Sequence, residues 1–296
     1  MKIVLAQTAG FCMGVRRAVD MALSLVRKAQ KDGPVYTFGP LIHNPQVLDR
    51  LASQGLKVLS SVPDRAEGTV LIRAHGVAPR VREGLAAAGL SVMDATCPRV
   101  AAVQEVLSRL KAEGRPAVIF GDPDHPEVQG LVGHAPEQAM VIRTPDEARK
   151  IPPQKGMGIV SQTTQDKAAY AAVCRVLTSR SPGAEVFFTI CGATEKRQNE
   201  ARDLARTVDA IVVVGGRDSA NTRRLHGVAS QTGALCFHVE DPRELDLPLL
   251  ASLDRVGITA GASTPRWVIR EVCRELEHAA AARKAAPGPR PLKALG

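Results

Sequence analysis

The stretch Asp94-Ala95-Thr96-Cys97-Pro98 places a cysteine between a short apolar run and a helical pattern. The preceding run, Leu90-Ser91-Val92-Met93, predicts a strand, and the pattern that begins at residue 99 predicts a helix. At such a turn the first backbone N–H groups of the helix are unpaired, and they favour a thiolate. One such cysteine means little by itself, but the chain repeats the arrangement twice.

Cys12 and Cys191 occupy the same kind of turn as Cys97. Cys12 follows the strand-like residues 2–6, and Cys191 follows the apolar residues 186–188. The spacing is regular, because 85 residues separate Cys12 from Cys97 and 94 separate Cys97 from Cys191. After each cysteine we predict a helix, over residues 15–31, 100–112 and 195–207. A buried-type strand follows each helix and ends in Gly39, Gly121 or Gly215. The chain therefore contains a threefold internal repeat.

A third strand and turn closes each repeat, at residues 70–76, 158–164 and 256–263. Strands that alternate with helices predict parallel sheets, which bind ligands at the carboxyl ends of their strands. We predict three α/β units related by a pseudo-threefold axis, arranged as a trefoil around one central site on which the three cysteines converge. The expected boundaries are 1–96, 97–190 and 191–284, with a C-terminal helix over residues 265–283 and a flexible tail at 285–296.

Composition and charge restrict the class of protein. The 296 residues, 45% of them hydrophobic, are enough for a large core. No run near the start resembles a signal peptide and none approaches a membrane span, so we expect a cytoplasmic protein that does not bind membranes. The net charge of +9 suits anionic small molecules or acidic redox partners. Aromatic residues make up only 3% of the chain, which argues against a nucleic-acid partner.

The three repeated cysteines lack a fourth cysteine at a matching position. A structural zinc site is usually closed by four protein ligands, whereas a cubane iron–sulfur cluster held by three cysteines keeps one iron open. The simpler interpretation is that such thiols are buried apolar groups, and we expect this of Cys174, Cys236 and Cys273, which lie within helical or strand patterns. Regular spacing favours a cluster for the repeated set.

Six further polar residues lie at predicted strand-to-helix turns. A lone histidine at a turn is most often a surface or cap residue, but here several donors occupy equivalent turns: His43, His75, His125, Ser219, Asn221 and Ser263. One helix terminus contributes at most about 2 kcal/mol, which is too little to hold a diphosphate. Several helix N-termini that converge on one point predict a phosphate or diphosphate site.

Glu127 follows His125 and Pro126 at the start of a predicted helix. A glutamate in a first helical turn is commonly explained by the helix dipole. The alternative is a proton donor that acts together with a hydroxyl such as that of Thr163, because a carboxyl group in a dry anion site can remain protonated. No nucleotide-binding motif accompanies Gly215 and Gly216, so electrons are expected to come from a partner protein.

The ordered motifs resemble those of the 4-hydroxy-3-methylbut-2-enyl diphosphate reductase family, the last enzymes of the methylerythritol phosphate route to isoprenoids. The resemblance runs from about residue 2 to residue 283. The motifs that carry it are Phe11-Cys12-Met13-Gly14-Val15, Ala74-His75-Gly76-Val77, Asp94-Ala95-Thr96-Cys97-Pro98, His125-Pro126-Glu127-Val128, Gln162-Thr163-Thr164, Cys191-Gly192-Ala193-Thr194 with Arg197-Gln198, and Gly261-Ala262-Ser263.

This resemblance implies a 4Fe–4S cluster on Cys12, Cys97 and Cys191, with the allylic hydroxyl of the substrate at the open iron. Two electrons, from ferredoxin or flavodoxin, and two protons would remove that hydroxyl as water, giving isopentenyl and dimethylallyl diphosphates. Glu127 would supply protons with the help of Thr163. The diphosphate would be held by His43, His75, His125, Ser219, Asn221 and Ser263. The family usually has Ser-Ser-Asn where this chain has Ser219-Ala220-Asn221, so one hydroxyl is missing.

Two other hypotheses remain open at this stage. One is another three-cysteine iron–sulfur enzyme, such as a quinolinate synthase-like dehydratase, although the three histidines suit a diphosphate better than small carboxylates. The other is an iron–sulfur or zinc-bearing nucleic-acid regulator, which the sequence pI of about 9.5 favours. A regulator would show nucleic-acid affinity that falls steeply with salt.

Overall fold

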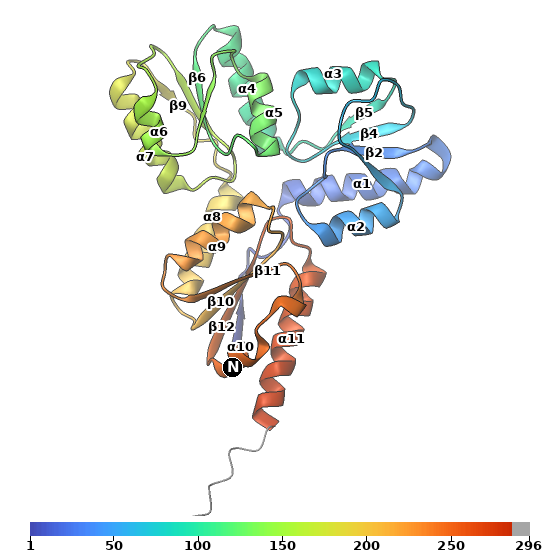
Figure 1. Ribbon diagram of the computed structural model, residues 1–296, viewed down its shortest axis with the longest axis vertical. Helices are drawn as coiled ribbons and strands as arrows, with labels where there is room; N and C mark the ends of the chain where they lie inside the picture. The colour runs from blue at the N-terminus through green and yellow to red at the C-terminus, as the bar shows by residue number, and fades with distance from the viewer. Residues whose placement is uncertain (286–296) are drawn as a thin grey trace, which may run out of the picture.

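A computed structural model describes residues 1–285, and for residues 29–32 it describes the backbone only. Three lobes meet at a common centre, and each contains one four-stranded sheet (Figure 1). Every strand pair in the three sheets is parallel. This arrangement confirms the predicted α/β architecture of three repeated units. The predicted tail at 285–296 lies outside the described residues, apart from Ala285 at the end of the last helix.

The first lobe has the strand order β3-β2-β4-β5. Its elements are α1 (Met13–Asp32), β2 (Val35–Phe38), α2 (Pro45–Ser53), β3 (Leu56–Leu59), β4 (Thr69–Ile72), α3 (Pro79–Ala87) and β5 (Ser91–Asp94).

The second lobe has the matching order β7-β6-β8-β9. Its elements are α4 (Pro98–Ala112), β6 (Ala117–Phe120), α5 (Pro126–His134), β7 (Met140–Ile142), α6 (Pro145–Lys150), β8 (Gly158–Ser161), α7 (Lys167–Arg180) and β9 (Glu185–Val186).

The third lobe is completed by the beginning of the chain, because its order is β1-β12-β10-β11. Its elements are β1 (Lys2–Leu5), α8 (Gly192–Ala205), β10 (Ala210–Val214), α9 (Ala220–Ser230), β11 (Leu235–Val239), a 3₁₀ turn (Pro242–Glu244), α10 (Leu247–Ser252), β12 (Arg255–Ala260) and α11 (Arg266–Ala285).

The place of β1 corrects one predicted boundary. We expected residues 1–96 to form the first unit, but β1 pairs with β12 from Lys2 against Arg255 to Leu5 against Ile258. The same connection occurs three times in the chain. Like β1, the strands β5 and β9 each form the edge of one sheet, and after each of them the chain passes through a cysteine turn into the next lobe. Residues 2–5 therefore belong to the third sheet. The boundaries after residues 96 and 190 stay predictions.

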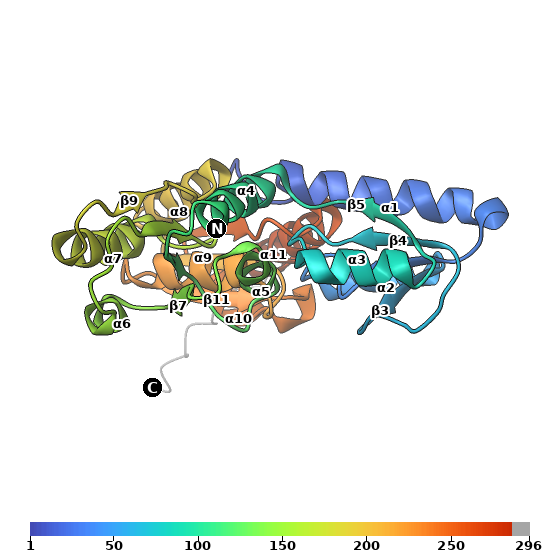
Figure 2. The same cartoon turned by 90° about the horizontal axis from the view of Figure 1, so that it is seen from above.

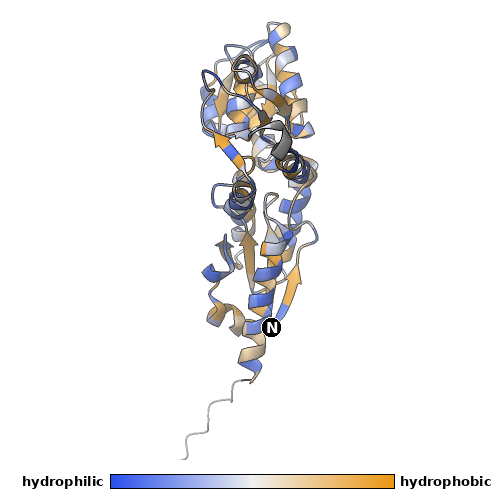
Figure 3. Ribbon diagram, turned by 90° about the vertical axis from the view of Figure 1, so that its right-hand side faces the viewer, coloured by the Kyte–Doolittle hydropathy of each residue, from blue (hydrophilic) through white to orange (hydrophobic). Residues whose placement is uncertain are grey.

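The strand sequences explain why these sheets are buried on both faces. The strands β6, β8 and β10 are buried at every position and read as continuous apolar or small residues, as parallel strands covered by helices do. In Figure 3 the hydrophobic strands lie between helices whose outer faces are hydrophilic.

The molecule is flat, and α1, α4 and α8 run along one of its broad faces (Figure 2). Within residues 1–285, no helix is long and apolar enough to cross a membrane.

Candidate functional site

One central cavity of about 110 Å³ is lined by all eleven predicted site residues. The three sheets point their carboxyl ends at this cavity, and each contributes three turns. The turns after β2, β6 and β10 carry His43, His125 and the pair Ser219 and Asn221. The turns after β4, β8 and β12 carry His75, Thr163 and Ser263, and those after β5, β9 and β1 carry the cysteines. The repeat thus explains the convergence of residues that are far apart in sequence.

The three cysteines are the N-cap residues of α1, α4 and α8. All three are free and partly exposed. The backbone N–H of Val15 donates a hydrogen bond to Sγ of Cys12, with 3.5 Å between nitrogen and sulfur. Burial raises the pKa of the Cys97 thiol, and backbone hydrogen bonds from Arg99 and Val100 act in the opposite direction. At Cys12 and Cys97, N–H groups of the first helical turn thus approach the sulfur atom, an arrangement that favours a thiolate.

The donor set around the thiols suits an iron–sulfur cluster with three protein ligands. Cys174, Cys236 and Cys273 lie in α7, β11 and α11 and do not line the cavity. Close packing also marks the thiol region, because a Cβ added to Gly14 would lie 2.5 Å from Sγ of Cys97. Three thiols on one cavity, with no fourth beside them, is the composition expected of a cluster that keeps one iron open.

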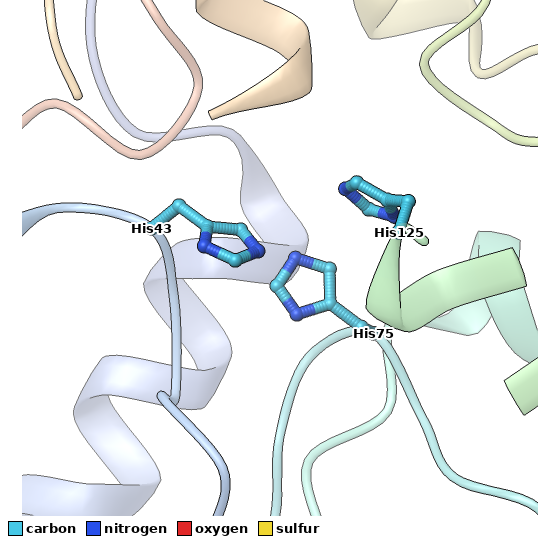
Figure 4. Close-up of side chains that lie close together, drawn as sticks. All are labelled: His43, His75 and His125. Atoms are coloured by element: carbon cyan, nitrogen blue, oxygen red, sulfur yellow. The ribbon is translucent and has the colours of Figure 1, made fainter. Parts of the chain in front are cut away.

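The histidines form a compact triangle on the same cavity, carried by the turns after β2, β4 and β6. Their ring centroids are 4.8 Å apart for His43 and His75, 5.7 Å for His43 and His125, and 5.3 Å for His75 and His125. Figure 4 shows the three rings turned toward one another. One nitrogen atom from each ring lies within 4.8 Å of the others, close enough to share one bound group. Nε2 of His43 and Nδ1 of His75 are buried without a hydrogen-bond partner among the described residues.

The buried position of the histidines favours their neutral form. Burial lowers the pKa of all three, to about 3 for His125, and the positive charge of Arg73 adds to the effect at His43. Neutral imidazoles next to helix N-termini are hydrogen-bond donors with spare capacity, and a bound diphosphate would favour their protonated forms. The unpaired nitrogen atoms therefore support a site built for an anion.

Ser219, Asn221 and Ser263 complete this side of the cavity. Oγ of Ser263 donates to the carbonyl oxygen of His43 at 3.0 Å and lies 3.4 Å from Oγ of Ser219. Ser219 is the N-cap of α9, and Nδ2 of Asn221 is buried without a partner among the described residues. These hydroxyl and amide groups line the same cavity as the histidines. The unpaired amide of Asn221 is a donor that a bound ligand could engage.

Glu127 is 2% exposed, and both oxygens of its carboxyl group accept hydrogen bonds from Thr163. The backbone N–H of Thr163 donates to Oε1 at 2.6 Å, and its hydroxyl donates to Oε2 at 2.9 Å. Burial raises the pKa of Glu127 to about 7, although both hydrogen bonds oppose the shift. A carboxyl group with this pKa can give and regain a proton near neutral pH.

The sequence analysis quoted Arg197 in a motif but gave it no role, although it is part of the cavity wall. Arg197 in α8 is 4% exposed and lines the cavity, and its guanidinium donates to the carbonyl oxygens of Gly10 at 2.9 Å and Ala260 at 2.6 Å. It thereby joins the turn before Cys12 to the end of β12. The signal was available, because Arg197 occupies the inward stripe of α8 together with Thr194 and Ala201. A charged residue on such a stripe indicates a buried ionic role.

Comparisons with known proteins agree with this site. The sequence matches the LytB protein family over residues 3–277. It is 45% identical over 277 residues to a protein of Geobacter sulfurreducens named 4-hydroxy-3-methylbut-2-enyl diphosphate reductase, covering 94% of this chain and 97% of the relative. A protein of the same name from Solidesulfovibrio magneticus is 43% identical, covering 94% of this chain and 99% of the relative.

Two solved structures share the fold. The E-1-hydroxy-2-methyl-but-2-enyl-4-diphosphate reductase of Plasmodium falciparum superposes with a TM-score of 0.85 at 26% identity, covering 92% of this chain and 87% of that one. A structure described as (E)-4-hydroxy-3-methyl-but-2-enyl diphosphate reductase, the terminal enzyme of the non-mevalonate pathway, superposes with a TM-score of 0.67 at 37% identity. It covers 94% of this chain and all of the other. By its sequence and its three-lobed fold, the chain belongs to the LytB protein family.

Proposed function

We propose that the protein is a reductase that converts (E)-4-hydroxy-3-methylbut-2-enyl diphosphate into isopentenyl and dimethylallyl diphosphates. The observation that carries the proposal is the convergence, in one cavity, of three thiols, an anion-binding set of side chains and a buried carboxyl group with a pKa of about 7. The balance is simple: two electrons and two protons enter, the C–O bond of the allylic alcohol breaks, and water leaves.

Cys12, Cys97 and Cys191 would hold a 4Fe–4S cluster. When bound, such a cluster supplies single electrons and an open iron that accepts an oxygen ligand. Ferredoxin or flavodoxin would provide the electrons. The six cysteines are free, which supports the expected location in the reducing cytoplasm.

The anion-binding side of the cavity would position the substrate. His43, His75 and His125 offer three neutral rings within reach of one phosphate group, and the unpaired amide of Asn221 adds a donor. Ser219 and Ser263 add hydroxyl groups. Several donors acting together offset the loss of water from the diphosphate, which a single helix N-terminus cannot do.

Glu127 would supply protons to the carbon or oxygen atoms of the bound allylic group. Its burial keeps it protonated up to about pH 7, and the hydroxyl of Thr163 lies 2.9 Å from Oε2, where it can pass a proton on. Because Thr163 holds both carboxyl oxygens, the side chain has one defined orientation. The pair therefore both stores the proton and directs it.

The test is an anaerobic assay with the cluster-loaded protein, reduced methyl viologen and the hydroxylated allylic diphosphate. We expect dye oxidation and both five-carbon diphosphates. Glu127→Gln should abolish turnover while the iron and sulfide content stays near normal. Glu147→Gln, a first-turn glutamate of α6 that also accepts a backbone hydrogen bond, is the matched control and should retain activity. An inactive wild type with an intact cluster would refute the proposed reaction, and an active Glu127→Gln would refute the proton relay.

A further inference from the structure

The broad face that carries α1, α4 and α8 has an unusual charge distribution around the cysteines. The N-termini of these helices converge at the cavity, and exposed basic side chains lie in the first turn of α1 and α4 and directly after that of α8, where helix dipoles favour acidic ones. Neither α1 nor α4 has an acid in its first turn, and neither does α11 beside them. The acid in the first turn of α8, Glu195, is paired with Lys167 at 2.7 Å.

We define the basic rim as the exposed residues Arg16, Arg17, Arg99, Lys196 and Arg266. Three of them, Arg16, Lys196 and Arg266, line a pocket of about 260 Å³ that reaches Cys12 from outside. Arg99 lines the central cavity beside Cys97, and Arg17 donates to the carbonyl oxygens of Asp94 and Thr96 in the turn that leads to Cys97. None of the five has an ion-pair partner among residues 1–28 and 33–285.

Two exposed apolar side chains accompany the rim. Met13, directly after Cys12, is 66% exposed, and Phe188, three residues before Cys191, is 86% exposed. They are the two most exposed large hydrophobic residues in the described chain. Arginine, methionine and aromatic residues are the types enriched in protein–protein interfaces. The helix ends thus combine uncompensated positive charge with exposed apolar anchors, next to the residues that would hold the cluster.

We propose that the basic rim, with Met13 and Phe188, is the docking surface for a small acidic electron-carrier protein. The inference rests on the proposed function, because that reaction needs electrons at the thiols. Charge complementarity selects the partner: an acidic carrier is steered to the rim, and electron-transfer complexes are small and transient. The location fits this use, since these charges lie at the outer approach to Cys12 and Cys97.

A second use of the same charges would be to stabilise the cluster, and a third would be to bind nucleic acid. The three uses predict different kinetics. Stabilising the cluster affects every reductant equally, whereas docking affects only a protein reductant. Nucleic-acid binding affects neither and would instead appear as retention on a polynucleotide.

The experiment compares two reductants in the cluster-loaded enzyme: a reduced plant-type ferredoxin and reduced methyl viologen. In the variant Arg16→Glu/Lys196→Glu we expect kcat/KM for ferredoxin to fall about tenfold or more. The rate with viologen should be no lower than that of the wild type. The wild-type rate with ferredoxin should also fall as salt rises to physiological strength, and the variant should lose this dependence.

The matched control is Lys57→Glu/Lys150→Glu, which makes the same change of net charge at exposed lysines in β3 and α6, away from the rim. It should behave as the wild type. Phe188→Ala provides a second variant that cannot fail through misfolding, because its side chain is exposed. It should raise KM for ferredoxin and leave the thermal midpoint unchanged.

Equal loss of both rates in the charge variant, or no loss with ferredoxin, would overturn the proposal. Retention of the wild type on immobilised polynucleotide at physiological salt, abolished in the variant whose ferredoxin kinetics are unchanged, would also overturn it. Failure of the proposed reaction is separable, because it would abolish turnover with viologen in the wild type. In that case, salt-dependent binding of oxidised ferredoxin would still test the surface.

Discussion

The side chain of Glu127 is enclosed by protein, and both of its oxygens accept hydrogen bonds from Thr163. Burial raises its pKa from 4.5 to about 7 because a charged carboxylate loses its hydration. The folded protein therefore binds this proton more tightly than the unfolded chain does. The contribution to stability is complete below about pH 4.5 and is lost as the pH rises through 7. The full difference is about 3 kcal/mol.

Glu127→Gln removes this titration, because glutamine stays neutral at every pH. We expect the variant to unfold at a higher temperature than the wild type at pH 8.5 and at a similar or lower temperature at pH 6. Anaerobic thermal unfolding of the cluster-loaded proteins at the two pH values measures the difference. Glu147→Gln, at a less buried carboxyl group, should show no such crossover. If the wild type and Glu127→Gln keep a constant difference across this range, burial does not protonate the side chain.

Ala220 occupies the position where the family resemblance leads us to expect a serine hydroxyl. It is 2% exposed, opens α9 and lines the cavity between Ser219 and Asn221. A hydrogen bond to a charged group contributes about 1.5–3 kcal/mol, and 1.4 kcal/mol is a factor of ten in affinity. We predict that Ala220→Ser binds isopentenyl diphosphate about tenfold more tightly, as measured by anaerobic calorimetry. Ala193→Ser, which lines the cavity at the start of α8, should leave the affinity unchanged. Equal affinities of wild type and Ala220→Ser would show that backbone N–H groups already satisfy the diphosphate.

Most of the cavity could be predicted from residues because polar groups after parallel strands must meet at one edge. Thr163 and Ser263, for example, follow equivalent strands in different lobes and both line the cavity. Arg197 could not be found in this way, because it lies inside a helix and its partners are backbone carbonyl oxygens of Gly10 and Ala260. The inward stripe of α8 marks Arg197 as buried, but no side-chain pattern records its backbone partners.

At the scale of elements, the helices that follow the cysteines begin earlier than expected. They start at Met13, Pro98 and Gly192, directly after each cysteine, whereas the predicted starts were residues 15, 100 and 195. Proline and glycine suggested a turn, but proline is well suited to the first helical position. The earlier start makes each cysteine an N-cap residue, and at Cys12 and Cys97 it brings backbone N–H groups of the helix to the sulfur atom.

Gly14 and Gly192 form a natural pair for testing this packing. A Cβ at Gly14 would lie 2.5 Å from Sγ of Cys97 and 3.1 Å from its Cβ, whereas one at Gly192 would meet nothing within 4 Å. We predict that Gly14→Ala displaces the thiol of Cys97 and lowers the iron content severalfold. Gly192→Ala should keep full iron content and gain about 0.5–1 kcal/mol of stability, because alanine is the better helix former. Iron and sulfide analysis with circular dichroism distinguishes cluster loss from unfolding. Full iron content in Gly14→Ala would show that α1 can move away from Cys97.

At the scale of the whole molecule, the sheet that contains β1 could not be predicted from the sequence. Its pairing with β12 places Lys2 opposite Arg255, and no local sequence pattern encodes a contact between residues so far apart in the chain. The consequence is a cyclic arrangement in which every lobe has four strands and every passage between lobes runs through a cysteine turn. Cys12, Cys97 and Cys191 therefore lie at the three junctions between lobes.

A cluster held at these junctions would tie the lobes together, so its removal should loosen the centre and leave the sheets intact. A group that binds only the folded state adds to its stability, and chelation of iron should lower the thermal midpoint by several degrees. Cys12→Ser should lie near the chelated value, while Cys236→Ser, in β11 away from the cavity, should respond to chelation as the wild type does.

Hydrogen exchange would locate the effect of iron removal. Each sheet has its own strand order and is buried between helices, so β6, β8 and β10 do not depend on the junctions for their hydrogen bonds. We expect faster exchange at residues 10–14, 95–99 and 189–193 after chelation, with the strands of all three sheets still protected. Equal loss of protection in the strands would mean that the lobes do not fold independently of the centre. In that case the cluster would be part of a single cooperative core, and the three-lobed architecture would describe the topology of the chain but not its stability.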